Sequence, residues 1–309
     1  MGRGAFRSRR GRGKLRRSPG RSPPSRLRAL PALGALLATA CFVPEYQAAQ
    51  GAGAGGSPSA SSSESASQST GAAGGTGGAV SPFGQALLFS GASARIEAGQ
   101  APTLDLSRSS FTVELWFRPN SLPVYQALVV HGAGNPTQPG WAIFTTDDGI
   151  TFHTADGSVG EHAGAASVLE VGHNHHIVVT RSGSDARILI LDATAGQTKH
   201  VAAGRSALLP TWASPLDQPF ELGGTYGGGN TIDFPVDGVV DDVRIWNVVL
   251  TNEEIDQKAG APVSCREAGL IAYWSMDQTG GNAVPHCDTR DNLDLVIAGE
   301  GYEWVPSPF

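Results

Sequence analysis

The 309-residue sequence has no long apolar run and no acidic residue among its first 28 positions. The early apolar segment ALPALGALLATAC holds about a dozen residues, too few for the roughly 20 that a membrane-spanning helix needs. Eleven of the 22 Lys and Arg residues precede position 29, which leaves eleven bases against 28 acids and a net charge of −17 for the rest. Because phosphate contacts need a basic patch, this acidic remainder argues against a nucleic-acid partner.

The basic leader and the apolar segment after it are typical of an export signal. Ala38, Thr39 and Ala40 fit the small-x-small pattern of a cleavage site, and Cys41 follows directly. This arrangement resembles a bacterial lipoprotein signal, in which the cysteine becomes the lipidated first residue. We therefore expect an exported protein at the cell surface or outer membrane, attached to the membrane only through a lipid on Cys41. Simple secretion and an Arg-rich organellar transit peptide are the alternatives.

The segment 48–80 contains no aromatic residue and consists almost wholly of Gly, Ala, Ser and Thr. Such a segment buries too little apolar surface to offset the entropy of ordering. We interpret it as a flexible tether, the alternative being a low-complexity segment without a role. The chain then divides into an export signal (1–40), a linker (41–80) and one folded domain (81–309).

The folded domain has short apolar runs separated by Gly, Pro, Asn and Asp, with few helical periods. This pattern predicts an all-β domain. The segment FTVELWFRP (111–119) alternates so that Phe, Val, Leu and Phe share one face, which we expect to point to a core. Residues 176–194 and 140–157 each predict a hairpin, with turns at SGSDA and at Asp148-Gly149. Short strands at regular spacing favour a sandwich of antiparallel sheets.

Several segments that follow one another in the chain carry a family resemblance, among them ALLFSGASARIEAG, SSFTVELWFRP, FELGGTYGGG and VDGVVDDVRIWNVVLTNEEI. In this order they resemble the LamG-like jelly-roll family, which has the concanavalin A-like lectin/glucanase fold. The resemblance spans essentially all of residues 81–309 and implies an antiparallel jelly-roll sandwich. It does not imply one function, since this fold hosts lectins, adhesion modules and glycanases.

The segment VDGVVDDVRIW places a carboxylate where its alternation predicts an apolar side chain. Val239, Val243 and Ile245 recur at even spacing, and Asp241 falls on the same face. A buried carboxylate needs hydrogen-bond donors, a cation or a proton. In similar domains this region can contribute to a calcium site with loop carbonyls, so calcium at Asp241 is one expectation. Because Ser90 replaces the aspartate of the family's first strand, we favour a carboxylate that accepts backbone hydrogen bonds instead.

The residues LTNEEI that follow predict a helix beginning at Asn252. Thr251 is a suitable N-cap, and Glu254 stands three residues later, as a capping box requires. Glucanases of the same fold carry two glutamates in an E-x-D-x-x-E pattern on one strand face, but here Ala259 occupies the second position. Retaining hydrolysis needs two carboxyls about 5 Å apart. Since the sequence also lacks a nucleophile-elbow motif, we expect no catalytic residue.

Four aromatic side chains are candidates for a platform on which sugar rings could stack: Trp116, Trp141, Trp246 and His153. The interaction is reasonable because a flat aromatic face packs well against the apolar face of a sugar. Packing in the core or within a strand face is the alternative for each tryptophan.

His173, His175 and His176 suggest a metal cluster by their proximity in the sequence. Positions 175 and 176 point to opposite faces of a strand, however, and no further Cys or His spacing completes a site. We therefore favour a polar start of a strand over metal ligation.

The sequence has only three cysteines, and Cys41 is separated from the folded domain by the linker. In the oxidising compartment that an export signal implies, we expect Cys265 and Cys287 to form a disulfide. Two buried free thiols are the alternative.

Together these features predict an exported, lipid-tethered module that binds a carbohydrate or an extracellular protein and has no chemistry of its own. A glycan-active enzyme of the glucanase type and a purely structural envelope module are the alternatives. Calcium is the one cofactor that the sequence suggests.

Overall fold

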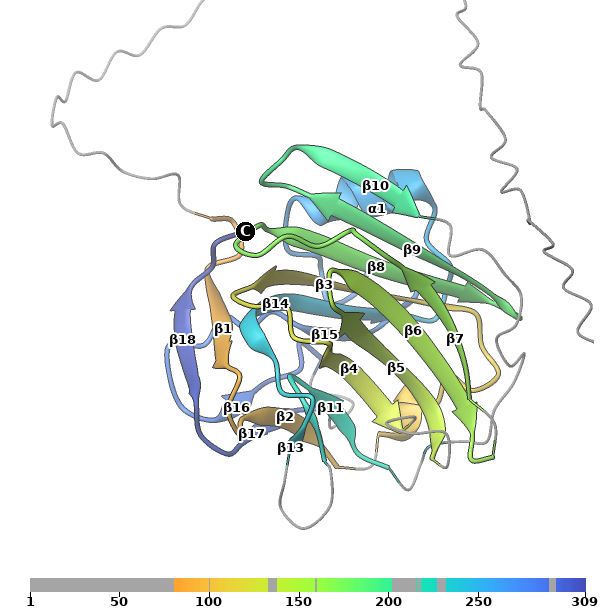
Figure 1. Cartoon of the computed structure of the whole chain (residues 1–309), viewed down its shortest axis with the longest axis horizontal. Helices are drawn as coiled ribbons and strands as arrows, with labels where there is room; N and C mark the ends of the chain where they lie inside the picture. Colours follow the sequence, from red (N-terminus) through yellow and green to blue (C-terminus); the bar gives the residue numbers. More distant parts are fainter. Residues whose placement is uncertain are drawn as a thin grey trace, which may run out of the picture. The chain divides into compact units, whose positions relative to one another are not determined.

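The computed structural model describes residues 81–99, 101–132, 138–158, 160–201, 215, 218–226, 232–288 and 293–309. Two antiparallel sheets of eight strands form a sandwich, which confirms the predicted all-β jelly roll (Figure 1). The predicted export signal, its Cys41 and the linker lie outside the described residues. Within the described residues, no helix has the length and apolar character needed to cross a membrane.

Sheet one contains, in spatial order, β10 (Gln197–Val201), β9 (Asp185–Asp192), β8 (His175–Ser182), β3 (Phe111–Pro119), β14 (Asp237–Trp246), β1 (Gln85–Ser90) and β18 (Tyr302–Pro306), with β15 (Leu270–Trp274) also paired to β14. Sheet two contains β16 (Ala283–Val284), β17 (Leu295–Ala298), β2 (Arg95–Ala98), β11 (Phe220–Leu222), β4 (Tyr125–Gly132), β5 (Pro139–Thr146), β6 (Gly149–Asp156) and β7 (Gly160–Ala165). A short ribbon pairs β12 (Thr225–Tyr226) with β13 (Ile232–Asp233), and one 3₁₀ turn, η1 (Pro102–Leu104), precedes β3.

The core lies between the two sheets and follows the alternation of the strands. On β3 the side chains of Phe111, Val113, Leu115 and Phe117 are fully buried in this core, as the sequence predicts. The other face of β3 is buried as well, since Thr112, Glu114 and Trp116 are at most 4 % exposed. A second layer therefore covers the outer face of sheet one.

Helix α1 (Asn252–Ala259) provides part of that covering layer. Ile255 of the helix and Leu250 before it pack with Val178 of β8 and Leu189 of β9. The predicted capping box is confirmed, because the Thr251 side chain accepts the Glu254 N–H and the Glu254 carboxylate accepts the Thr251 N–H. Glu254 thus caps a helix instead of lying on a strand face as a catalytic glutamate would.

Both predicted hairpins are present, and one turn differs by a residue. Strands β8 and β9 pair from His175 with Asp192 to Ser182 with Asp185. Strands β5 and β6 turn at Asp147 and Asp148, one residue earlier than predicted, and Asp147 takes the left-handed conformation (φ +52°). Gly149 belongs to β6, where a Cβ would stand only 2.6 Å from the Ala165 carbonyl oxygen of β7. The glycine is therefore needed for close packing of the strands and not for the turn itself.

Strand β14 contains a bulge that corrects the predicted face of Asp241. Asp241 shares the outer face with Val239, as expected, but Asp242 has φ +52° and the register with β3 shifts between Asp241 and Arg244. The extra residue reverses the alternation beyond this point. Val243 and Ile245 consequently lie in the core between the sheets, whereas Asp241 faces the layer outside sheet one, opposite Trp116.

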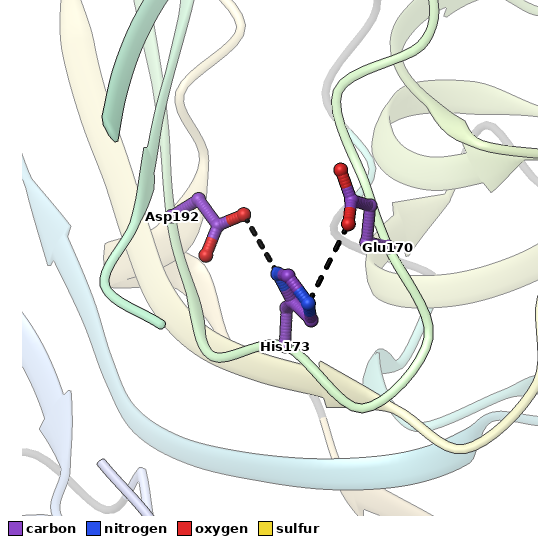
Figure 2. Close-up of side chains that lie close together, drawn as sticks. All are labelled: Glu170, His173 and Asp192. Carbon is purple, nitrogen blue, oxygen red and sulfur yellow. Dashed lines mark hydrogen bonds and ion pairs between the residues drawn. The ribbon is translucent and has the colours of Figure 1, made fainter. Parts of the chain in front are cut away.

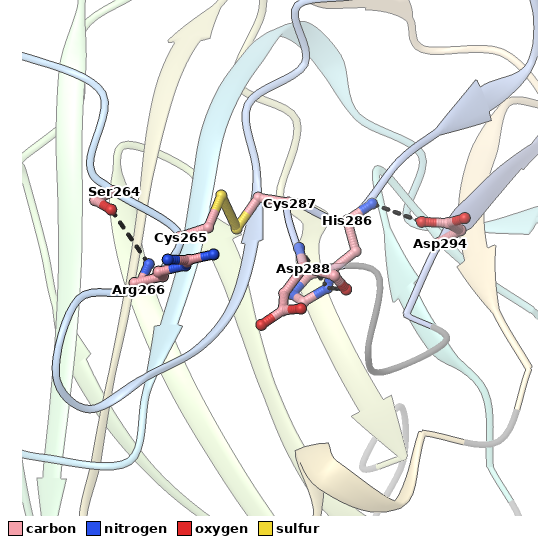
Figure 3. The surroundings of a disulfide bond; sticks show 7 residues. All are labelled: Ser264, Cys265, Arg266, His286, Cys287, Asp288 and Asp294. Carbon is pink, nitrogen blue, oxygen red and sulfur yellow. Dashed lines mark hydrogen bonds between the residues drawn. A yellow bond between two sulfur atoms is a disulfide. The ribbon is translucent and has the colours of Figure 1, made fainter.

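The predicted Cys265–Cys287 disulfide is present (Figure 3). The two Cα atoms are 5.6 Å apart, a separation typical of disulfides. The bridge links the loop before β15 to the segment after β16, and the Cys287 N–H also donates to the Tyr273 carbonyl of β15 (3.0 Å). The bridge cross-links two loops in the C-terminal part of the domain, where the strands are short.

Candidate functional site

The three tryptophans proposed as a sugar platform are buried, which corrects that prediction. Trp116 is 4 % exposed, and Trp141 and Trp246 are fully buried. Trp116 packs against Phe83, and the Trp246 indole N–H donates to the Glu114 carboxylate (2.9 Å). They belong to the two packed layers because β3, β5 and β14 are covered on both faces. None of the three presents a ring face to solvent.

Asp241 is fully buried and accepts a hydrogen bond from the Ser307 hydroxyl (Oγ–Oδ2 2.7 Å). Burial, reinforced by the charges of Asp242 and Asp277 and partly offset by Ser307, raises the pKa of Asp241 to about 9. The carboxyl is therefore protonated near neutral pH. Its donors are the Ser307 hydroxyl and the Asp242 backbone, so one backbone group of the kind that we favoured from the sequence is present and a side chain adds to it.

A buried ionic cluster lies next to Asp241 on the outer face of sheet one. The Arg244 guanidinium contacts the carboxylates of both Asp242 and Glu114, and the His176 ring lies 3.3 Å from Glu114. Burial alone would raise the pKa of Glu114, but the hydrogen bond and charge of His176, together with Arg244, lower it. Arg244 also donates to the Lys258 carbonyl of α1 (2.9 Å). The cluster therefore anchors the helix to the sheet.

The three histidines of the 173–176 segment divide between two environments. His176 faces Glu114 and stacks against Trp116 on the outer face of sheet one, with 4.9 Å between ring centroids. The rings of His173 and His175 stack on each other, with centroids 6.2 Å apart. Positions 175 and 176 thus point to opposite sides, as predicted. His173 contacts two carboxylates that the sequence pattern did not connect with it.

An exposed aromatic pair lies where β4 begins and β13 ends. Tyr125 is 47 % exposed and Phe234 is 37 % exposed, and their ring centroids are 5.7 Å apart. Phe144 of β5 lies beneath them, 5.7 Å from Phe234, and Val124 beside them is 58 % exposed. We call Val124, Tyr125 and Phe234 the aromatic surface.

Phe234 is held in an unfavourable backbone conformation at this surface. Its φ of +53° lies in the left-handed region, which a bulky non-glycine residue rarely adopts. The Phe234 carbonyl accepts the Ala127 N–H of β4 (2.8 Å), which fixes the segment against sheet two. Strained residues of this kind cluster at functional sites because the surrounding structure must hold them in place.

A hydrogen-bonded polar network borders the aromatic surface. Asp237 accepts from the side chains of Asn120 (3.4 Å) and Ser121, and its N–H donates to the Gln126 side chain (2.7 Å). The Gln126 amide in turn donates to the Ser121 carbonyl (3.0 Å). Gly91 leaves room for this arrangement, since a Cβ there would stand 3.2 Å from the Asp237 Cβ. Asn120 is exposed, and Ser121 and Asp237 are half-buried, so solvent or a ligand can reach them.

Together the aromatic surface and this network offer a flat apolar area beside groups that donate and accept hydrogen bonds. A sugar ring needs both, because it presents C–H groups on its faces and hydroxyls at its edges. The sequence reasoning missed this site, whose parts are more than 100 positions apart in the chain. One signal was available: Phe234 precedes Pro235 in a short loop, where an aromatic residue has no evident role in packing.

A separate cleft of about 510 Å³ lies beside the disulfide. Its wall includes Cys265, Cys287, Arg266, His286 and Asp288 (Figure 3). The His286 N–H donates to the Asp294 carboxylate (2.8 Å), and its ring nitrogen contacts the Asp288 backbone, so part of the polar lining is occupied internally. The cleft has both polar and apolar lining residues, the apolar ones including Leu270 and Ile271, and its described lining contains no Trp, Tyr or Phe.

Comparison with solved structures supports the fold. The chain resembles a candidate carbohydrate-binding protein from Bacteroides ovatus with a TM-score of 0.51 and 15 % identity, over 73 % of this chain and 60 % of that one. It thus spans about three fifths of that structure. Weaker similarity extends to the LG1-3 region of the laminin alpha2 chain (TM-score 0.41, 17 % identity, 53 % of this chain and 31 % of that one). It extends also to the CBM40 domain of the Ruminococcus gnavus IT-sialidase (TM-score 0.42, 12 % identity, over 58 % of this chain and 99 % of that one).

A search of curated proteins found no match to this chain. A family model does match, over residues 90–256, which is more than half of the chain. The matched segment runs from the end of β1 into α1 and includes both parts of the aromatic surface and its polar network. The chain therefore belongs to the concanavalin A-like lectin/glucanases superfamily.

Proposed function

We propose that residues 81–309 form a non-catalytic binding module that holds a carbohydrate at the aromatic surface. The observation that carries this proposal is the exposed Tyr125–Phe234 pair, with Phe234 kept at φ +53° beside the polar network of Asp237. An exposed aromatic residue held at positive φ is a strained surface position, and such positions cluster at functional sites.

The chemistry of the site favours a sugar over a purely apolar ligand. Tyr125 and Phe234 supply ring area for stacking, whereas Asn120 supplies an exposed amide that both donates and accepts hydrogen bonds. Membership of a superfamily that contains lectins is consistent with this choice. The similarity to the Bacteroides ovatus protein shows the fold alone at 15 % identity, yet it agrees with carbohydrate as the ligand class. An extracellular protein ligand is the alternative for the same surface.

The glutamates that pair with arginine in the described part of the chain are poorly suited to glycoside hydrolysis. Glu97 and Glu221 share the Arg95 guanidinium (2.7 and 3.3 Å), and the Glu114 pair with Arg244 is buried. A retaining mechanism needs one carboxyl kept protonated and another free to attack the sugar. Carboxylates neutralised by arginine fill neither role. We therefore propose binding without catalysis, with a glycan-active enzyme as the second candidate for this superfamily.

The predicted export signal adds a location outside the cell to this proposal. A lipid on Cys41 would attach the module to a membrane, and the linker would let it reach ligands outside the cell. The flexible composition of residues 48–80 suits such a tether.

A glycan array with the full-length chain tests the proposal. We expect binding to a subset of glycans, with Tyr125→Ala weakening it at least about tenfold because a stacking face is lost. Val296→Ala is the matched control, since Val296 has the same exposed fraction as Tyr125 (47 %) and also lies on sheet two. Binding should survive this control.

The Phe234→Gly variant separates function from folding. Glycine adopts positive φ without strain, which offsets part of the lost ring contact, so the melting temperature should stay within a few degrees of wild type. Glycan binding should nevertheless be lost. A wild-type chain that binds no glycan, or binding that persists in both Tyr125→Ala and Phe234→Gly, would contradict the proposal.

A further inference from the structure

Three side chains outside the aromatic surface converge at the start of β8. Glu170 and His173 belong to the loop before this strand, and Asp192 ends β9 (Figure 2). The ligand atoms that they offer all lie within 4.8 Å of one another. One His173 nitrogen lies 2.9 Å from the Asp192 carboxylate, and the other lies 3.5 Å from the Glu170 carboxylate. Figure 2 shows the imidazole between the two acids.

The hairpin register explains this convergence. Asp192 pairs with His175 across β8 and β9, so a residue two positions before His175 reaches the same side of the strand end. A tight turn then returns the chain, because the His173 N–H donates to the Glu170 carbonyl (3.2 Å). Both acids therefore approach the imidazole, although one of them is 19 positions away in the chain.

The loop is fixed on both sides. The Gly172 N–H donates to the Pro119 carbonyl at the end of β3 (2.8 Å), and the Asn174 N–H donates to the Thr194 hydroxyl (2.8 Å). Asp192 also accepts the Ala195 N–H (2.9 Å), which orients its carboxylate. The Asp192 carboxylate is thus held in place before any ion binds, which lowers the entropic cost of binding one. Because Asp192 and Glu170 face different nitrogens of the His173 ring, one ion that binds all three side chains requires the ring or the exposed Glu170 side chain to move.

The three side chains differ in exposure in a way that suits ion capture. The Asp192 side chain is 1 % exposed, His173 is 29 % exposed and Glu170 is 59 % exposed. An ion can therefore approach from solvent, meet the exposed Glu170 carboxylate, and rest on a buried Asp192 carboxylate.

The charge balance also favours a cation. Among the ion pairs of the described residues, Glu170 and Asp192 each pair only with His173, and neither pairs with Lys or Arg. The charged side chains near Asp192 are the imidazoles of His173 and His175. A divalent ion would neutralise both carboxylates.

We propose that Glu170, His173 and Asp192 bind a divalent transition-metal cation, with zinc as the best-suited member of the class. Zinc accepts histidine nitrogen and carboxylate oxygen together, and three protein ligands leave a position for water. Calcium and magnesium prefer an all-oxygen set, so the imidazole selects against them. The bound ion would clamp the loop before β8 to the end of β9.

Zinc titration of the full-length, chelator-treated chain tests this proposal by calorimetry and thermal unfolding. We expect one zinc ion per chain and, at a hundredfold excess over Kd, a melting temperature raised by about 5 °C or more. Calcium and magnesium at the same concentration should have little effect. The titration needs no glycan, so its result is independent of the proposed sugar site.

Two variants and one control locate the ion. Glu170→Gln changes an exposed side chain without disturbing the fold, and His173→Gln removes the nitrogen ligand; each should weaken zinc binding at least about tenfold. His162→Gln removes an exposed imidazole from β7 and should leave the affinity unchanged. A wild type that binds no zinc up to about 1 mM, or binding that survives both variants, would overturn the proposal.

Discussion

Replacing Asp241 by asparagine should abolish a specific pH dependence of folding stability. The asparagine side chain would keep an oxygen that accepts the Ser307 hydroxyl, but it cannot ionise. In the wild type, burial raises the pKa of Asp241 to about 9 from an ordinary value of 3.8. The folded state therefore binds a proton that the unfolded state releases above about pH 4.

The direction and the size of the stability change with pH follow from this difference in pKa. A raised pKa stabilises the fold fully below pH 4, and this contribution is lost progressively as the pH rises toward 9. Between pH 5 and pH 8 the loss is about 4 kcal/mol, since each pH unit within the window costs about 1.4 kcal/mol. This loss is an upper limit, because the protein around the ionised carboxylate can relax and so reduce the cost of burying its charge. Asp242, whose pKa burial raises to about 6, titrates in both proteins and cancels in the comparison.

Urea unfolding of wild type and Asp241→Asn at pH 5 and pH 8, each with EDTA or with calcium, measures the effect. The stability of the variant relative to the wild type should therefore rise by up to about 4 kcal/mol between pH 5 and pH 8. A stability difference that does not change with pH would refute the protonated carboxyl. Calcium that stabilises the wild type but not the variant would show instead that Asp241 is an ionised calcium ligand.

Two further predictions concern the cysteines. Reduction of the Cys265–Cys287 bridge, whose partners are 22 positions apart, should cost about 3 kcal/mol on the chain-entropy estimate and lower the melting temperature by roughly 6–12 °C; two cysteines that alkylate after unfolding without reductant would contradict the bridge. In a bacterial host, a fatty-acid probe should label the wild type, and Cys41→Ser should release the protein from the membrane fraction, whereas an unlabelled, freely soluble wild type would reject the lipid tether.

Local signals in the sequence predict the parts of the fold that local physics determines. The alternation of 111–119 identifies a core strand, and the turn residues around 183 identify the β8–β9 hairpin. The Thr251–Glu254 capping box specifies where α1 begins, because both of its hydrogen bonds join residues three positions apart. Each of these predictions needs no knowledge of the distant chain.

The features that the sequence did not predict depend on distant pairing. The bulge at Asp242 reverses the alternation of β14, so period-two reasoning places Asp241 on the same face as Val243 and Ile245, although it lies on the opposite one. The buried position of Trp246 depends on a helix that covers the outer face of the sheet. The site was missed for the same reason, since Tyr125 and Phe234 meet only when β4 and the segment before β14 are side by side.

The His173 cluster shows that some non-local information was nevertheless available. The hairpin predicted from the sequence covers residues 176–194, and the register that the structure shows places residue 192 opposite residue 175. Extending that register by two residues, to the end of the strand, would have predicted that Asp192 lies near His173. The search for a second Cys or His spacing overlooked it, because the partners of this imidazole are carboxylates.

Chemical-shift mapping with an isotope-labelled full-length chain and a glycan that binds on the array tests the central claim most directly. The proposed function predicts the largest shifts at Tyr125, Phe234 and Asn120, with smaller ones at Asp237 through the shared network. Shifts centred on Arg266 and His286 would place the ligand in the cleft beside the disulfide instead and would contradict the aromatic surface as the binding site.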